Sequence, residues 1–236
     1  MMGRFAHVIA GVTWIGLLYF FNFVQVPAFA ELSDGARSEA LRKLTFRALW
    51  WFRYAALATF LFGILLVGIQ SNSDIPDYNY FEGPSGTAIL TGMLFGITMF
   101  VNVWGIIWRN QKIVIANARN VQAGGEADPE AAAAGRKALL ASRMNAIFSL
   151  PMLVFMVGTA HFPYNQLLPP EGGKRALYWG VTLVIWAVLE ANALGWIGGT
   201  KPGGTNAIYD THKNALITGF VLAVVWLGLF SLALTR

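Results

Sequence analysis

Histidines are the residues of this chain best suited to chemistry, because neutral imidazole is a common ligand of iron and other metals. There are three of them. His7 lies near the start of one long apolar segment, and His161 ends another within LVFMVGTAHFPYN, residues 153–165. His212 precedes a third apolar segment. The chain has no cysteine, which excludes disulfides, iron–sulfur ligation, thiolate zinc sites and covalently attached c-type haem.

The neighbours of two histidines indicate what they could bind. Gly11 and Trp14 follow His7 by four and seven residues, so all three share one helix face. Gly158 precedes His161 by three residues, and a small residue one turn away leaves room for a flat group. The spacing is compatible with a haem b whose iron is bound by His7 and His161. The alternative is two interfacial histidines that contact headgroups or bond to carbonyls.

The composition shows which elements must position these residues. Hydrophobic residues make up 56% of the chain and charged residues 12%, against about 25% charged in soluble domains. A membrane-spanning helix needs about 20 apolar residues. Six segments of this kind occur, at residues 5–29, 49–70, 87–108, 144–162, 177–198 and 214–234. We therefore expect one all-α domain over residues 1–236, a polytopic membrane helix bundle.

Two polar segments connect these spans at one membrane surface. Residues 31–48 have the pattern of an amphipathic helix lying at the interface. Residues 109–143 form the longest connection, a charged segment that Gly and Pro interrupt. Both segments contribute to the charge asymmetry that sets the orientation.

The basic residues predict the orientation in the membrane. Thirteen of the 17 Lys and Arg residues fall on one side, within 37–53, 109–143 and 201–213. The other four are Arg4, Lys174, Arg175 and Arg236. The positive-inside rule then predicts a multi-pass protein of the bacterial inner membrane with both termini periplasmic. His7 and His161 share the outer leaflet in this orientation. The basic residues serve topology, so we expect no nucleic-acid partner.

A second polar layer is expected in the inner half of the bundle. Its members are Asn22, Arg53, Asn102, Asn145, Glu190 and Asn192. A charge inside the bilayer costs at least about 2.5–3.5 kcal/mol, so it normally faces protein or water and has a partner. One interpretation is a polar pocket for a substrate or a proton route. The other is an Arg53–Glu190 salt bridge with asparagines joining the helices, unless Arg53 extends to the headgroups.

Three stretches resemble a known family. They are HVIAGVTWIGLLYF (residues 7–20), NVWGIIWRNQK (102–112) and SRMNAIFSLPMLVFMVGTAHFPY (142–164). In this order they resemble the membrane domain of bacterial membrane-bound urate hydroxylases, the urate oxidase N-terminal domain. The resemblance implies a helical membrane domain followed by a periplasmic c-type cytochrome. It also implies oxidation of urate to 5-hydroxyisourate, with electrons passed to the respiratory chain.

The chain matches the family pattern at some positions and departs from it at others. The matching positions are His7, Trp14, Asn102, Trp104, Gln111, Asn145, Pro151 and His161. The family has a short acidic or Asn motif where this chain has FNFVQVPAF, and a histidine late in the fifth span where it has LEANALGW. The Cys-x-x-Cys-His motif of an attached cytochrome is missing, so a separate cytochrome would have to take the electrons.

These observations favour a urate-oxidase-like integral membrane redox protein that binds haem and passes electrons to a separate periplasmic cytochrome c. The alternative is a non-catalytic accessory subunit of a larger respiratory or photosynthetic membrane complex. In that case the apolar outer surfaces would contact partner subunits. A transporter is disfavoured because the sequence shows no inverted repeat and no matching pair of broken helices.

Overall fold

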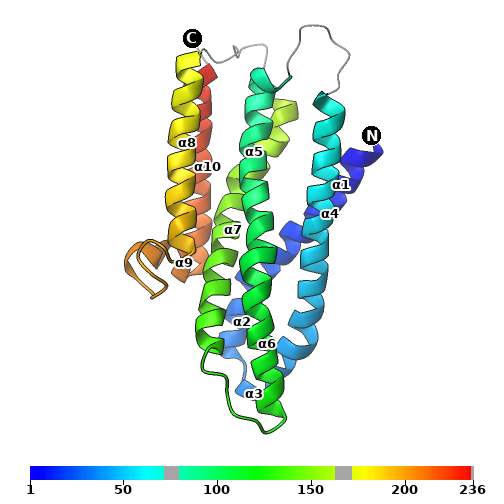
Figure 1. Ribbon diagram of the computed structural model, residues 1–236, viewed down its shortest axis with the longest axis vertical. Coiled ribbons are helices and arrows are strands. Elements are labelled where there is room, and N and C mark those ends of the chain that lie inside the picture. Colours follow the sequence, from blue (N-terminus) through cyan, green and yellow to red (C-terminus); the bar gives the residue numbers. More distant parts are fainter. Residues whose placement is uncertain (72–79, 163–171, 235–236) are drawn as a thin grey trace.

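A computed structural model describes residues 1–71, 80–162 and 172–234, and these form an elongated bundle of helices with no strand among them (Figure 1). The first long helix consists of α1 (Met2–Tyr19), the π-helical segment η1 (Phe20–Gln25) and α2 (Val26–Glu31). The second consists of α3 (Asp34–Ala40), η2 (Leu41–Thr45) and α4 (Phe46–Ser71). After η3 (Tyr80–Glu82), the third consists of α5 (Pro84–Val101), η4 (Asn102–Ile107) and α6 (Trp108–Gln122).

The second half of the chain is less interrupted. It contains α7 (Ala131–His161), α8 (Gly172–Ala193), the short turns η6 (Gly204–Asn206) and α9 (Ala207–Asp210), and α10 (His212–Leu234). Six of the helices formed by the described residues are long and apolar enough to cross a membrane. The predicted polytopic helical bundle is therefore confirmed.

Two segments differ from the expectation. Residues 34–45 are the first turns of the second long helix and continue into α4, so they do not form a separate helix. Residues 109–122 belong to α6 and residues 131–143 are the first turns of α7, so the predicted long loop shrinks to 123–130. The chain turns at Gly124, whose φ of +86° is easily adopted by glycine and strained for residues that have a Cβ. Charged residues can continue a helix beyond the bilayer, because water solvates their side chains there.

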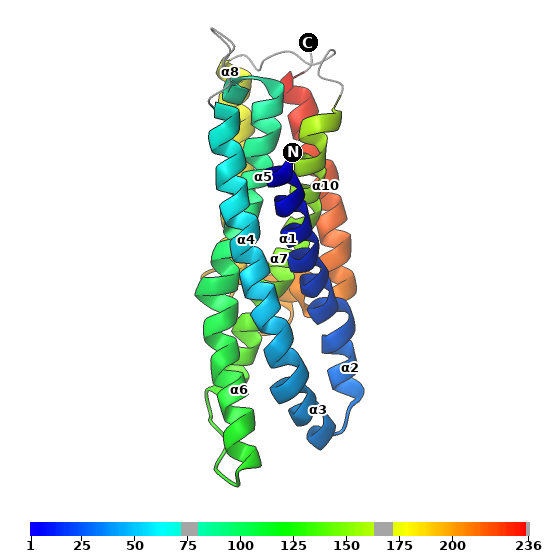
Figure 2. The ribbon, with the colours of Figure 1, turned by 90° about the vertical axis from the view of Figure 1, so that its right-hand side faces the viewer.

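Helix α7 is the centre of the bundle. In its most apolar stretch 67% of the residues are buried, against 28% to 39% in the other five spans. It packs against α5, α6 and α10, while α1 packs against α4 (Figure 2). Phe95 of α5, Phe148 of α7 and Trp226 of α10 form the middle of the core, with the Phe95 and Trp226 ring centroids 4.6 Å apart. Helix α7 therefore provides the scaffold for buried polar groups.

Three π-helical segments, η1, η2 and η4, interrupt the described helices. A π segment has one extra residue in a turn, changes the direction of side chains, and occurs often at functional sites. The segments η1 and η4 carry Asn22 and Asn102, both members of the predicted polar layer. The irregular turns of the bundle thus coincide with its buried amides.

Candidate redox site and polar interior

His7 lies in the contact between α1 and α4. Its Nδ1 is 2.9 Å from the carbonyl oxygen of Thr59, and a Cβ added at Gly63 would lie 3.3 Å from its ring. A carbonyl can only accept, so this bond places the proton on Nδ1 of the neutral ring and the lone pair on Nε2. A metal-binding histidine commonly has this arrangement, with a carbonyl orienting the ring through the nitrogen that does not bind the metal.

His161 has the same local arrangement at the end of α7. Its Nδ1 is 3.0 Å from the carbonyl oxygen of Val157 in the preceding turn, and the residue is exposed. Nε2 is again the nitrogen left to bind another group. Both α7 and α10 end, and α1 begins, in the same half of the bundle (Figures 1 and 2), whereas His212 opens α10 at the opposite end of that helix.

The structure places His7 and His161 in one half of the bundle without joining them (Figures 1 and 2). Among the described contacts, His7 bonds to α4 and His161 to its own helix, and none links the two rings. The two Nε2 atoms are of a kind that can bind iron. The space expected beside Gly158 does not fit a flat cofactor, because a Cβ there would lie 2.2 Å from the Phe162 ring. The Phe162 ring fills this space because it packs against Phe155 and Phe230.

Gly11 and Trp14 also have contacts within the protein. A Cβ at Gly11 would meet the Thr59 side chain at 3.8 Å, so this glycine lies in the packing between α1 and α4. Trp14 is 2% exposed, and its indole N–H has no hydrogen-bond acceptor. A buried donor without an acceptor costs free energy, so this indole is a ready hydrogen-bond donor to a bound group.

Asparagines join α7 to both neighbouring π segments. Asn22 of η1 donates from Nδ2 to Ser142 Oγ at 2.8 Å. Asn102 of η4 donates to Asn145 Oδ1 at 3.0 Å, and Asn145 donates to the carbonyl of Met99 at 3.0 Å. All three asparagines are at most 2% exposed. This side of α7 therefore carries a continuous polar strip in the apolar bundle.

Glu190 of α8 lies at the edge of this strip. The Asn102 side chain donates towards its carboxyl, while Oε2 has no hydrogen-bond partner. Tyr209 of α9 is close by and donates to the carbonyl of Leu189 at 3.0 Å. Burial, together with the charge of Glu190, raises the pKa of Tyr209, so this phenol stays protonated as a donor. The buried carboxyl therefore has one donor contact and one free oxygen.

Arg53 and Glu190 do not form the salt bridge that depth alone suggested. The Arg53 guanidinium stacks on Trp108, 3.3 Å from the ring centroid, and also lies 5.7 Å from the centroid of Trp104. The aromatic faces attract the cation from α6 and η4, which lie beside α4. Glu190 contacts η4 through a different residue, Asn102. The two charges thus lie in separate environments.

Arg143 is a buried cation within the segment 109–143, for which the sequence predicts a loop. It lies on α7, is 2% exposed, and its Nε and Nη1 have no hydrogen-bond partner. Asp210 attracts it and Arg136 repels it. Asp210 itself bonds to Arg136 at 2.7 Å and to the Gly203 N–H at 2.7 Å. Partial burial acts to raise the pKa of Asp210, but these two donors outweigh it and the net shift is downward.

Asn192 has a structural role. Its Nδ2 donates to the carbonyl of Ile197 at 2.8 Å and to Thr205 Oγ1 at 2.9 Å. These bonds fix the glycine-rich loop after α8, in which Gly195, Gly198 and Gly203 have positive φ. The sequence pattern had placed this stretch at the end of a longer fifth span, but the helix ends at Ala193.

The fold and the site together define a class of protein. In the described parts of the chain, six membrane-length helices enclose a strip of buried amides, with two oriented imidazoles in one half of the bundle. This is a polytopic α-helical membrane protein with a polar interior.

Its relationship to a particular family comes from the sequence. Residues 77–169 match the family model described as "Urate oxidase N-terminal", so this part of the chain is a urate oxidase N-terminal domain match. The match includes Asn102, Asn145 and His161 and begins after His7. No curated protein and no solved structure matches the chain.

Proposed function

We propose that the protein is a urate-oxidase-like integral membrane redox protein of the bacterial inner membrane, with both termini periplasmic. His7 and His161 bind a haem b through Nε2, and electrons pass to a separate periplasmic cytochrome c. The observation that carries the proposal is the matched state of the two imidazoles: each has Nδ1 at a backbone carbonyl, and both lie in one half of the bundle.

The roles of the protein groups follow from their contacts. The carbonyls of Thr59 and Val157 hold the two rings in one tautomer, which leaves each Nε2 able to bind iron. When bound, haem would supply one-electron transfer. Phe162 fills the space beside Gly158, so a planar group could not use that space. The Trp14 indole is an unused donor on the helix face that carries His7.

We assign the polar strip to binding of the substrate or to transfer of protons. Glu190 has a free carboxyl oxygen, Asn22 has a free amide oxygen, and Arg143 has free guanidinium donors. Urate is a planar anion that carries both donors and acceptors, so groups of these types could bind it. The same groups could instead move a proton through the inner half of the bundle. The family match supports urate as the substrate class.

Electron delivery to a cytochrome tests this function. The purified protein in detergent is mixed with urate and oxidised soluble cytochrome c without oxygen, and cytochrome reduction is followed by absorbance. We expect reduction that requires both urate and the membrane protein. A folded protein that leaves the cytochrome oxidised, and that runs in native mass measurement with other subunits, would support the accessory-subunit alternative and reject the enzyme.

A further inference from the structure

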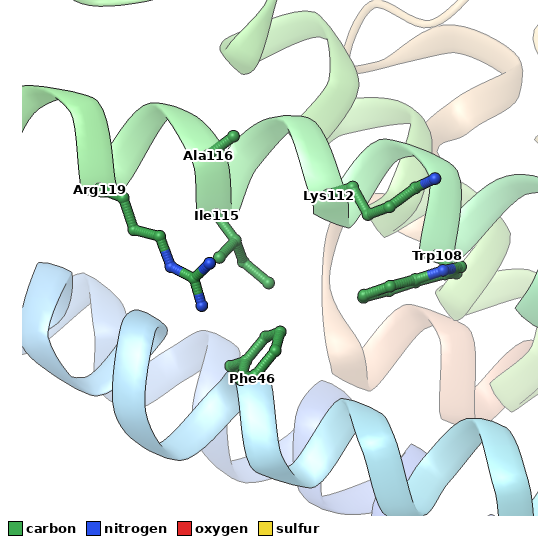
Figure 3. A pocket seen from close by; sticks show the side chains of 6 residues that line it. All are labelled: Phe46, Trp108, Lys112, Ile115, Ala116 and Arg119. Carbon is green, nitrogen blue, oxygen red and sulfur yellow. The ribbon is translucent and has the colours of Figure 1, made fainter.

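A cavity of about 240 Å³ lies between α4 and α6, away from the histidines and the buried asparagines (Figure 3). It is lined by Phe46, Trp108, Lys112, Ile115, Ala116 and Arg119. Figure 3 shows Phe46 rising from α4 towards α6, with Trp108 on the other side of the opening. The walls are therefore aromatic and aliphatic, while both charged groups are cations.

The two cations of the cavity lie against aromatic rings. Arg119 lies 4.8 Å from the centroid of Phe46, and the Lys112 amine lies 5.8 Å from the centroid of Trp108. In the described parts of the chain neither forms an ion pair with a carboxylate. Arg53 adds a third cation against the same Trp108 ring. The positive charge at this cavity is thus left for an external anion.

Exposed tryptophans near the cavity indicate the level of a membrane surface. Trp50 and Trp51, about one turn from Phe46, are 47% and 61% exposed, as in the aromatic belt of a bilayer interface. At a rise of about 1.5 Å per residue, Lys112 lies about 6 Å beyond Trp108. Helical side chains lean towards the N-terminus, and α6 begins at Trp108 on the bilayer side. The charged ends of Lys112 and Arg119 therefore point back towards the headgroups.

We infer that this cavity binds the phosphate of an anionic phospholipid, with Lys112 and Arg119 holding the charge and Phe46 and Trp108 contacting the glycerol and upper acyl carbons. Basic pockets between membrane helices recognise such headgroups. The volume is below the roughly 300–1,000 Å³ of drug-sized ligand sites, which suits a headgroup better than a complete cofactor. The site is independent of the proposed redox function.

Native mass spectrometry of the detergent-solubilised protein tests this site. Phosphatidylglycerol and phosphatidylethanolamine with identical acyl chains are added separately, and the retained lipid is counted. Wild type should retain phosphatidylglycerol preferentially, and the double variant Lys112→Ala/Arg119→Ala should retain at least about tenfold less. The matched control is Arg109→Ala, an exposed cation of the same helix outside the cavity, which should bind as wild type does.

A charge-conserving variant and two other outcomes complete the test of the lipid site. The double variant Lys112→Arg/Arg119→Lys keeps the charges and should keep the lipid, which separates charge recognition from misfolding. Equal retention of both lipids by wild type, or an equal loss in Arg109→Ala, would overturn the proposal. Inorganic phosphate that binds in the lipid's place and displaces it at millimolar concentration would show a site for soluble anions, which also overturns it.

Discussion

Alanine at His7 or at His161 should reduce the haem bound per chain at least about tenfold, because each substitution removes one of the two proposed iron ligands. Loss of even an orienting group outside the ligand set costs roughly 10–100-fold in metal affinity. His7 donates to Thr59 and His161 to Val157, so in both variants the carbonyl remains and only the ring is lost. The measurement is haem absorbance per mole of protein purified from haem-replete cells.

The third histidine provides the matched control. His212 lies at the far end of α10, where its ring contacts Phe23 at a centroid distance of 6.4 Å. His212→Ala should therefore keep the haem content of wild type. Helical circular dichroism of each variant shows that the bundle has folded. Equal haem in all four proteins would mean that neither His7 nor His161 binds the iron.

Leucine at Asn145 should lower the free energy of unfolding by about 1–3 kcal/mol. Asn145 is fully buried, accepts from Asn102 and donates to the Met99 carbonyl, so leucine removes two hydrogen bonds at nearly constant volume. Hydrogen bonds between membrane helices contribute roughly 0.6–1.7 kcal/mol each. Unfolding in detergent by added sodium dodecyl sulfate, followed by circular dichroism, measures the change.

The same substitution at an exposed asparagine is the control for Asn145→Leu. It shows how much of the stability change comes from burial of the asparagine. Asn120 donates to the carbonyl of Glu126 near the turn after α6, where water can replace the bond. Asn120→Leu should change the unfolding free energy by less than about 0.5 kcal/mol. If Asn145→Leu were as stable as this control, the buried strip on α7 would not stabilise the bundle.

The apolar pattern predicted the large features of this fold. Each of the six predicted spans is a long and mostly hydrophobic stretch, and a bilayer leaves a spanning backbone few alternatives to the helix. The apolar pattern did not predict where the helices end, because α6 and α7 continue through polar residues that lack the hydrophobicity of a membrane span. Arg143 was therefore assigned to a loop, although it lies buried on α7.

The spacing of residues along one helix could not predict which side chains meet between helices. The spacing predicts room for a flat group beside Gly158, but the fold places the Phe162 ring in that space. Arg53 and Glu190 were paired by depth, whereas their neighbours depend on which helices are adjacent. The π segments η1 and η4 add a residue to a turn, so a regular 3.6-residue period cannot predict which way Asn22 and Asn102 point.

The absorbance spectrum of the purified wild-type protein, recorded oxidised and then reduced, tests the central claim most directly. The account predicts a Soret band that shifts on reduction, at a stoichiometry of about one haem per chain when both histidines bind iron. A fully helical, folded protein from haem-replete cells that shows no absorbance beyond its aromatic residues would contradict it.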